Sequence, residues 1–457
     1  MSFVEDDSIQ IIACNNPELP SELALLPLNR GKLLVSRSHA VFCRISLEDL
    51  PLVMDLATSR IKASDLPQPL HETLTSHGFF SPPRPAKPEP QTVQIQITNR
   101  CNLLCSYCCT NSGEPREREI SLETVREVLT TTREKLGPGI RVAILGGEPL
   151  LVPWALEAAD FGASLGLDVT LFSNGVPLAS QAMAEQCARS CARGVKFRIS
   201  LAGPTRELCD DKSGNDRFDA VVTGLNNLYR FGGEAIIDLM LFPEHVDEVA
   251  SHLHHLRGLL PPGIVIAFGI AYVSGREVGA NLFESHQTME EALDRISFEA
   301  GETIAAFTPS PLADRREGCS CAMGRHLHVR SDGSLFPCFK MEEKVGHLNH
   351  EGFAASLQHV HTHPHPARDL KKCSVCVLNT LCGAGCRSDN FLYTGDPEVP
   401  LCDTWRVRVV SELLADDWAG ALEWPVHHLL SEAKRRNIPC PSELKPVISS
   451  RHLLETR

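Results

Sequence analysis

Short apolar runs alternate with longer segments of helical spacing from residue 91 to residue 272. The first run lies at 93–97, and the apolar residues of 121–136 then recur three and four positions apart. Runs of the first kind favour buried strands, and spacing of the second kind favours amphipathic helices. Further strands are predicted at 142–145, 167–172, 195–201, 235–242 and 264–272, and further helices at 154–164, 181–192, 220–229 and 245–256.

This alternation indicates an α/β fold. Six strand–helix units with short links predict parallel strands whose connecting helices lie outside the sheet. The pattern alone leaves a barrel and an open doubly wound sheet as alternatives. No glycine-rich nucleotide-binding motif follows the first strand; cysteines follow it instead.

The regions on either side of these units differ from them. Residues 1–80 predict a small α+β domain, with paired strands at 31–35 and 40–45 and helical spacing after them. The proline-rich segment 81–90 predicts a stiff linker. We expect the strand–helix domain at 91–310, with a last helix at 285–308. A cysteine-rich domain is expected at 311–406, and its residues 319–402 are predicted to contain few strands. A helical tail is expected at 407–457.

Charge and composition narrow the functional classes. The net charge of −13 disfavours a nucleic-acid partner, because phosphates would be repelled. No apolar run reaches the roughly 18 residues that a membrane-spanning helix needs, and the N-terminus lacks a secretory pattern. We therefore expect a cytoplasmic protein. In that reducing compartment, 18 cysteines indicate metal binding or catalysis rather than disulfides.

The first cysteine group follows the first predicted strand. Cys101, Cys105 and Cys108 form a CxxxCxxC motif in a loop at the carboxyl end of that strand, where barrel active sites assemble. Three thiolates can hold three irons of a cubane cluster and leave the fourth iron open. The residue types alone leave zinc as an alternative.

This motif, with Tyr107 before its last cysteine, resembles the signature of the radical S-adenosylmethionine superfamily. Motifs similar to the family's GGEP, ribose-facing and SLDG positions then follow at the ends of the second, third and fourth strands. The resemblance implies a partial (β/α)6 barrel and a [4Fe–4S] cluster whose open iron binds S-adenosylmethionine, which is cleaved to a 5′-deoxyadenosyl radical. The residues it implies at the cofactor are Tyr107, Gly146, Gly147, Glu148, Pro149, Ser173, Asn174, Ser200 and Arg276.

For three of these residues the resemblance implies a particular contact with S-adenosylmethionine. By analogy Tyr107 lies near the adenine, Glu148 accepts hydrogen bonds from the methionine amine, and Arg276 binds the carboxylate, a surface position being its alternative. Ala202 stands where many peptide-modifying relatives have Asp. No general base is assigned, and the candidates are Asp210, Asp211 and Asp216.

The second cysteine group lies in the C-terminal third. Cys373-x2-Cys376-x5-Cys382-x3-Cys386 is followed by Cys402 and preceded by a GxxxxC motif. This pattern resembles the SPASM domain of peptide-maturing radical enzymes, which holds two auxiliary [4Fe–4S] clusters. The implied ligands are Cys319, Cys321, Cys338 and Cys386 for one cluster, and Cys373, Cys376, Cys382 and Cys402 for the other. Two structural zinc ions are the alternative.

The substrate is inferred from weaker motifs. Residues 29–35 and 78–80 resemble the small peptide-recognition domain of many such enzymes, which implies binding of a peptide by strand addition; a capping role is the alternative. Residues 94–100, 108–113 and 144–151 look most like the maturation enzyme of quinohemoprotein amine dehydrogenase.

That resemblance implies thioether crosslinks from Cys to Asp or Glu carbons in a small protein subunit, with an electron donor such as flavodoxin or ferredoxin. Phe339 directly after the GxxxxC cysteine disfavours sulfatase activation, for which relatives have Asp there. The alternatives are another radical modification, namely a dehydrogenation or a carbon–carbon crosslink, and a non-enzymatic zinc-binding scaffold.

Overall fold

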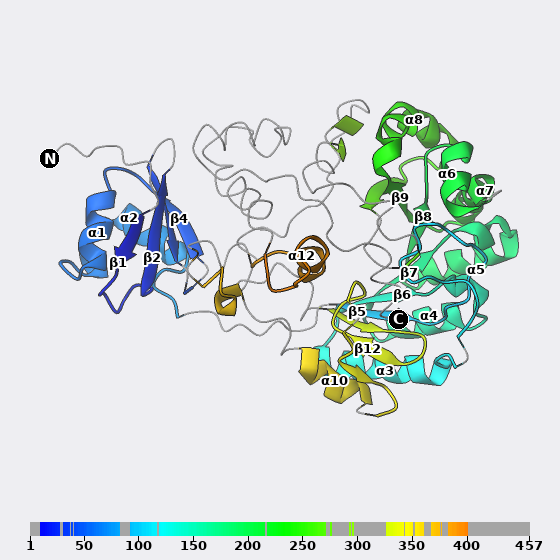
Figure 1. Cartoon of the computed structure of the whole chain (residues 1–457), viewed down its shortest axis with the longest axis horizontal. Helices are drawn as coiled ribbons and strands as arrows, with labels where there is room; N and C mark the ends of the chain where they lie inside the picture. Colours follow the sequence, from blue (N-terminus) through cyan, green and yellow to red (C-terminus); the bar gives the residue numbers. More distant parts are fainter. Residues whose placement is uncertain are drawn as a thin grey trace. The chain divides into compact units, whose positions relative to one another are not determined.

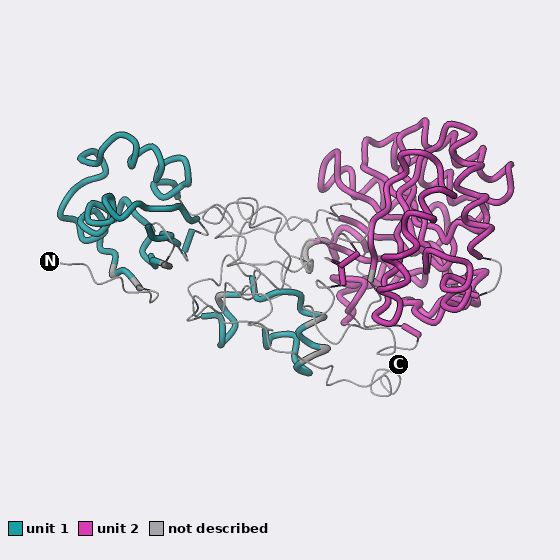
Figure 2. Tube along the Cα trace, turned by 90° about the horizontal axis from the view of Figure 1, so that it is seen from above, with its two compact units in different colours: residues 1–87, 307–321, 365–442 teal, residues 88–306, 322–364, 443–457 magenta. Residues whose placement is uncertain are grey.

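The structure is a computed structural model, and it divides into two compact units, each described by itself below (Figure 2). One unit comprises residues 88–306 and 322–364 with 443–457, and the other comprises 1–87, 307–321 and 365–442. The residues that the structure describes are 10–27, 31–36, 38–39, 41–82, 92–116, 118–214, 217–270, 275–276, 292–293, 295–296, 326–341, 343–350, 352–360, 367–374, 376 and 383–400.

The larger unit is built on six parallel strands that are neighbours in the order in which they occur along the chain. They are β5 (Thr92–Gln96), β6 (Arg141–Leu145), β7 (Asp168–Ser173), β8 (Lys196–Leu201), β9 (Ile236–Leu241) and β10 (Val265–Ile270). All six predicted strands are therefore confirmed. A doubly wound sheet reverses its strand order at a switch point. The six strands β5 to β10 show no reversal, which is the order of a partial barrel.

The connecting helices lie along one side of this sheet (Figure 1). They are α3 (Leu122–Leu136), α4 (Ala155–Ser164), α5 (Gln181–Ala192), α7 (Arg217–Arg230) and α8 (Val246–Leu259), with α6 (Arg206–Ser213) and the short helices η2 (Pro149–Leu151), η3 (Val176–Ala179) and η4 (Pro243–His245) between them. Helix α3 packs against α4, α4 against α5, and α5 against α7. The five predicted helices are confirmed, and Ser121 caps α3 as expected, accepting a hydrogen bond from the N–H of Thr124.

The two faces of the sheet differ in polarity. Val93 and Ile95 of β5 are fully buried in the core shared with the helices, whereas Gln94 and Gln96 alternate with them. Because side chains alternate across a strand, both glutamines lie on the face away from the helices. On β8 and β9 that face carries an ion pair between Arg198 and Asp238. The face away from the helices thus carries polar side chains on β5, β8 and β9, and the helix-covered face holds the apolar core.

Three strands of the cysteine-rich region extend this sheet. β11 (His326–Val329) pairs in parallel with β5, and β12 (Ser334–Phe336) and β13 (Gly346–His347) continue antiparallel from it. Helix α10 (Gly352–Val360) packs on β11, β13 and α3. The prediction of a strand-poor module was wrong for this part, because such short strands leave little pattern and β11 is stabilised by pairing with a distant partner.

The N-terminal region forms a sheet of its own. β1 (Gln10–Ala13), β2 (Glu22–Pro27), β3 (Lys32–Ser36) and β4 (Val41–Ile45) are antiparallel neighbours, followed by α1 (Leu50–Ala57), η1 (Ala63–Asp65) and α2 (Gln68–Ser76). The predicted pair β3–β4 is confirmed, and β1 and β2 were not expected. The side chains of Leu34, Leu56 and Leu74 are buried in a core whose buried members, among the described residues, all lie between 12 and 79. This sheet therefore has a hydrophobic core of its own.

The remaining described elements are η6 (Ala367–Asp369) and α12 (Arg387–Thr394). Three predicted segments cannot be compared with the structure. The tail from 407 lies wholly outside the described residues, and the helix at 285–308 and the linker at 81–90 lie largely outside them. Among the helices of the described part, none is long and apolar enough to cross a membrane.

Candidate functional site

The loop that leaves β5 carries the CxxxCxxC motif and closes on itself. The N–H of Cys101 donates to the carbonyl of Gly113 at 2.8 Å, and the N–H of Gly113 donates to Asn99 at 3.0 Å. Cys101, Cys105 and Cys108 are all half-buried on this loop. Since the loop starts at the carboxyl end of a parallel strand, its three thiols lie where barrel active sites form.

Each of these three sulfurs has a hydrogen-bond donor near it. Asn174 Nδ2 lies 3.8 Å from Cys101 Sγ, and Arg217 Nη1 lies 4.0 Å from Cys105 Sγ. The N–H of Ser112 donates to Cys108 Sγ at 3.3 Å. Donors of this kind stabilise thiolates and tune the potential of the iron–sulfur clusters that thiolates hold.

Two of these thiols hold their protons more tightly than an exposed cysteine does. Burial raises the pKa of Cys101 to about 11, and burial also raises the pKa of Cys105 against the opposing effect of Arg217. Metal binding would have to displace these protons. Among the described residues, no three His, Cys, Asp or Glu side chains come close enough to hold a single metal ion. A cubane binds each thiolate through a different iron, so this donor set fits a cluster without converging on one point.

The GGEP motif after β6 packs directly against this loop. A Cβ on Gly147 would overlap the carbonyl oxygen of Arg100, and one on Gly146 would lie 2.8 Å from the carbonyl oxygen of Thr98. The N–H groups of Gly147 and Glu148 donate to Thr98 and Arg100, each at 2.8 Å. Both glycines therefore let the backbone of this turn approach the start of the cysteine loop.

Glu148 is completely buried beside the loop. Its carboxylate accepts hydrogen bonds from the N–H of Leu150 at 3.0 Å, the hydroxyl of Ser173 at 2.8 Å and the N–H of Asn174 at 2.6 Å. Burial raises the pKa of Glu148 to about 7, and these three donors oppose that rise. The motifs after β6 and β7 are thus joined through one carboxylate, while Pro149 begins η2.

Tyr107 and Ser200 meet through a residue that the sequence analysis did not single out. Arg217 Nη1 donates to Tyr107 Oη at 2.9 Å, and Nη2 donates to Ser200 Oγ at 2.9 Å and to the carbonyl of Ser200. The Tyr107 ring also packs edge-on against Phe242, with centroids 5.2 Å apart. Arg217 belongs to no recognisable motif. Its signal in the sequence is a cation in the first turn of a helix, where the helix dipole disfavours positive charge.

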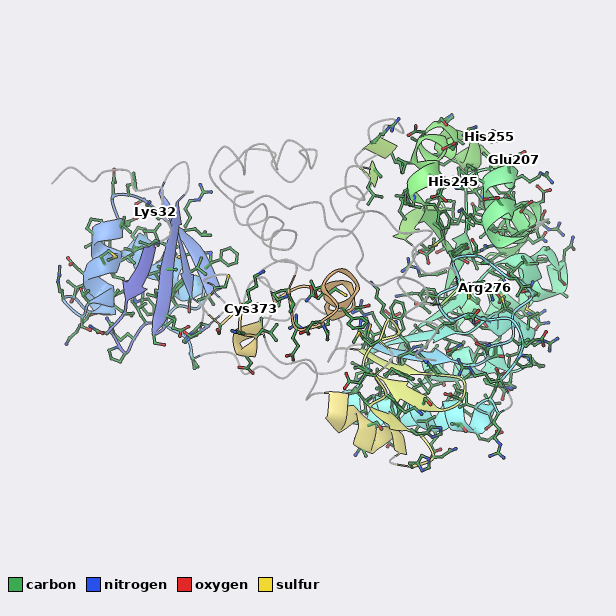
Figure 3. The ribbon with its side chains drawn as sticks, viewed as in Figure 1. Lys32, Glu207, His245, His255, Arg276 and Cys373 are labelled. Carbon is green, nitrogen blue, oxygen red and sulfur yellow. The ribbon has the colours of Figure 1, made fainter. Side chains whose placement is uncertain are left out.

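Arg276 is not an isolated surface residue. Its backbone N–H donates to Cys108, and its guanidinium donates to the carbonyls of Cys105 and Ser112, each at 2.7 Å. The preceding Gly275 has a φ of +91°, and a Cβ there would overlap the carbonyl of Cys108. Arg276, labelled in Figure 3, therefore ties the cysteine loop to the chain that follows β10. The predicted contact with a carboxylate stays a prediction.

A second residue absent from the sequence analysis holds the start of the loop. Glu119 accepts hydrogen bonds from the Thr98 hydroxyl at 2.6 Å, the Asn99 N–H at 2.5 Å and the Arg116 N–H at 3.1 Å. An acidic residue just before a helix is too common to be recognised from the sequence as such an anchor.

The three candidate bases are placed differently. Asp210 Oδ1 accepts the N–H groups of Arg217 and Phe218 at 3.1 and 3.2 Å, so this carboxylate caps the start of α7. Asp211 is exposed on α6, and Asp216 lies outside the described residues. None of them is brought to the cysteine loop by a described side-chain contact. The assignment of a general base stays open.

The second cysteine group is only partly described. Cys338 follows β12 in the larger unit, and Cys373 (labelled in Figure 3) and Cys376 lie in a turn after η6 in the other unit. Cys386 is the N-cap residue of α12. Cys319, Cys321, Cys382 and Cys402 lie outside the described residues. Both auxiliary ligand sets therefore stay predictions.

Comparison with known proteins agrees with this geometry. Residues 95–256 match the family model described as the Radical SAM superfamily. The mycofactocin maturase MftC of Mycolicibacterium smegmatis is 25% identical over 327 residues, which cover 66% of this chain and 79% of that protein. The sporulation killing factor maturation protein SkfB of Bacillus subtilis is 23% identical over 305 residues, covering 63% and 68%.

The fold is also found among solved structures. Streptococcus suis SuiB bound to the precursor peptide SuiA aligns with a TM-score of 0.54 at 15% identity, covering 80% of this chain and 94% of that one. At this level of identity the likeness concerns the fold. The sheet and helices of the larger unit thus have the architecture of a radical SAM protein.

Proposed function

We propose that this chain, which carries a radical SAM domain over residues 95–256 and has peptide maturases among its homologues, is an S-adenosylmethionine-dependent enzyme that modifies a peptide or small protein. The observation that carries the proposal is the closed loop of three cysteines, each with a hydrogen-bond donor at its sulfur, beside the buried Glu148.

In this proposal Cys101, Cys105 and Cys108 hold a [4Fe–4S] cluster, and S-adenosylmethionine binds at its open iron. When bound, the cluster and S-adenosylmethionine together supply the removal of a hydrogen atom from an unactivated carbon. The chain itself contributes in two ways. Gly146 and Gly147 shape the cysteine loop, and the surrounding residues hold hydrogen-bond donors beside the three cysteine sulfurs. The cofactor would lie among Tyr107, Glu148, Pro149, Ser173, Asn174, Ser200 and Arg276.

Glu148 has the properties needed to bind an ammonium group. Its carboxylate is fully buried and held by three donors, so its position is fixed before any ligand arrives. A positive charge beside it would favour the ionised form that burial disfavours. The amine of S-adenosylmethionine is the ammonium group that we assign to it.

A peptide substrate is supported by two observations. The relatives MftC and SkfB are named as a maturase and a maturation protein, and SuiB is seen with a precursor peptide. The N-terminal sheet has β1 and β4 at its edges within the described residues. An extended peptide can add to such an edge through backbone hydrogen bonds. We propose residues 1–80 as the peptide-recognition domain.

The modification that we propose is an intrapeptide thioether between Cys and an Asp or Glu carbon, in the small subunit of a quinohemoprotein amine dehydrogenase. Forming this carbon–sulfur bond removes the thiol hydrogen and one hydrogen from carbon, and two electrons leave the peptide. One leaves with the hydrogen atom taken by the S-adenosylmethionine chemistry, and the other needs an acceptor. Two auxiliary [4Fe–4S] clusters on the second cysteine group are proposed as that acceptor, and flavodoxin or ferredoxin as the external electron donor.

Anaerobic purification with iron, sulfide and zinc analysis is the first test. About twelve irons per chain are expected for three four-iron clusters, together with 5′-deoxyadenosine after reduction with S-adenosylmethionine. Incubation with the small subunit is then followed by mass spectrometry. Loss of two hydrogens and one free thiol per crosslink supports thioether formation. The same mass loss with all thiols retained indicates dehydrogenation or a carbon–carbon crosslink. Zinc in place of iron, without cleavage, contradicts the enzyme.

A further inference from the structure

Arg217 is a buried cation at the centre of the site. Its side chain stands in the first turn of α7 and is 1% exposed. The guanidinium donates to Tyr107 and Ser200, which are both neutral, and its Nε has no hydrogen-bond partner among the described residues. Burial of a charge is costly unless an opposite charge lies close to it. The helix dipole at this end of α7 adds to that cost.

No carboxylate in the described part of the chain forms an ion pair with Arg217. The neighbouring cations differ in this respect, since Lys212 pairs with Glu244 and Arg198 pairs with Asp238. The buried Glu148 is near enough for Arg217 to lower its pKa. However, its oxygens accept hydrogen bonds from Leu150, Ser173 and Asn174, and none from Arg217. Asp210 caps α7 through the backbone N–H groups of Arg217 and Phe218. In the described part of the chain, no hydrogen bond or ion pair therefore joins the guanidinium of Arg217 to a carboxylate.

The thiol of Cys105, one of the three predicted cluster ligands, has its Sγ 4.0 Å from Nη1 of Arg217. Three thiolates outweigh the positive charge of an oxidised cubane core, so the cluster they hold is itself an anion. We propose that Arg217 is the counter-charge of this cluster, positioned by Tyr107 and Ser200, and that it sets the cluster's reduction potential. This inference rests on the proposed function of the cysteine loop.

The sign of the effect follows from electrostatics. Reduction adds one negative charge to the cluster, and a fixed cation beside it stabilises the reduced form more than the oxidised form. Arg217 thus makes the cluster easier to reduce, whether or not S-adenosylmethionine is bound.

The test is an EPR-monitored redox titration of the full-length, anaerobically purified protein without S-adenosylmethionine. The loop cluster is identified as the signal that changes when S-adenosylmethionine is added in a parallel sample. R217Q removes the charge and is expected to lower the reduced-to-oxidised ratio at a fixed potential at least about tenfold, or about 59 mV for a one-electron couple. R217K keeps the charge and loses only the planar, two-pronged guanidinium. Its reduced-to-oxidised ratio is expected to stay within about threefold of the wild-type ratio.

Lys212→Met is the matched control, because it removes a nearby cation whose charge Glu244 already balances. Its potential is expected to equal that of the wild type. An R217Q potential equal to wild type, with weaker S-adenosylmethionine binding instead, overturns the proposal in favour of a ligand contact. If R217Q binds no iron at the loop, R217K decides. An R217K protein that keeps its iron and the wild-type potential supports the proposed counter-charge. Loss of iron in both variants overturns the proposal. Wild-type protein without this cluster would instead contradict the proposed function itself.

Discussion

At the scale of single residues, Glu148 links stability to pH. Its pKa of about 7 lies above the ordinary value of 4.5 because the carboxyl is buried, so the folded protein binds this proton more tightly than the unfolded chain. Its contribution to stability is complete below pH 4.5 and is lost as pH rises toward 7. Over that window the loss amounts to roughly 3 kcal/mol at most, since one pKa unit is about 1.4 kcal/mol.

The Glu148→Gln variant tests this linkage, because Gln keeps the shape of the side chain and cannot ionise. The difference in unfolding temperature between wild type and Glu148→Gln is expected to change in favour of the variant between pH 5 and pH 7.5. Differential scanning calorimetry of both proteins in matched buffers gives this difference directly. A difference that is independent of pH would show that the carboxyl is already ionised throughout the range.

Arg276 supports a second prediction at this scale. Its guanidinium donates to two carbonyls of the cysteine loop, so Arg276→Ala is expected to loosen the loop and lower its iron content. Loss of two charged hydrogen bonds costs on the order of 3 kcal/mol. Iron and sulfide analysis of the purified variant measures the effect.

The control for Arg276→Ala separates this role from the one first predicted. If Arg276 mainly binds the carboxylate of S-adenosylmethionine, the variant keeps all its iron and shows weaker binding of the cofactor. Arg257→Ala on α8 is a suitable comparison, since the guanidinium of this arginine donates to the carbonyl of Ile264, just before β10. It is expected to retain the iron content of the wild type.

At the scale of elements, the contact between the β6 turn and the cysteine loop depends on the absence of a side chain. Gly147→Ala would push a methyl group into the carbonyl of Arg100, which cannot move without shifting the cysteine loop. We expect destabilisation by about 1–3 kcal/mol, as in overpacked cores, and reduced iron loading. Thermal unfolding followed by circular dichroism, together with iron analysis, measures both.

Gly258→Ala provides the opposite case in the same unit. Gly258 lies inside α8, and a Cβ there meets nothing within 4 Å. Alanine is therefore expected to stabilise the helix by about 0.5–1 kcal/mol. Equal destabilisation by both substitutions would mean that crowding against the loop is not what requires Gly147.

Elements were predictable from the sequence where pattern and pairing are local. The six parallel strands are short apolar runs, and each of their helices repeats its apolar residues at helical spacing, so both were recognised. β11 was missed because His326 and His328 interrupt a four-residue strand whose stability comes from pairing with β5, more than 200 positions earlier. β1 is equally short, and it too depends on the strand beside it.

The site follows the same rule. Cys101, Glu148 and Ser173 were found because they stand in motifs at predicted strand ends, and the structure joins the last two by a hydrogen bond. Arg217 and Glu119 were missed, since their importance lies in which distant groups they reach. Their neighbours in the sequence carry no trace of those contacts. A buried charge becomes recognisable only when its burial and its partners are known.

At the scale of the whole molecule, the N-terminal sheet has its own hydrophobic core, formed by residues 12–79. Such a domain does not need the barrel to bury its apolar side chains, so its removal is expected to leave the barrel folded. If it recognises the peptide, a chain that begins at residue 83 keeps the cleavage of S-adenosylmethionine in the absence of peptide within about twofold. Modification of the peptide at low concentration is expected to fall more than tenfold, because about 1.4 kcal/mol of lost binding has that effect.

Peptide concentration distinguishes this role from a structural one. The truncated chain is compared with the full chain at rising peptide concentration, with 5′-deoxyadenosine and crosslinked peptide measured together. If the domain binds the peptide, its removal raises KM and leaves kcat almost unchanged, since the proposed radical chemistry belongs to the barrel. The full chain given a peptide that lacks the segment bound by this domain serves as the control and is expected to show the same rise in KM. If truncation abolishes peptide-independent cleavage or iron binding, the N-terminal domain stabilises the barrel, and recognition must be sought elsewhere in the chain.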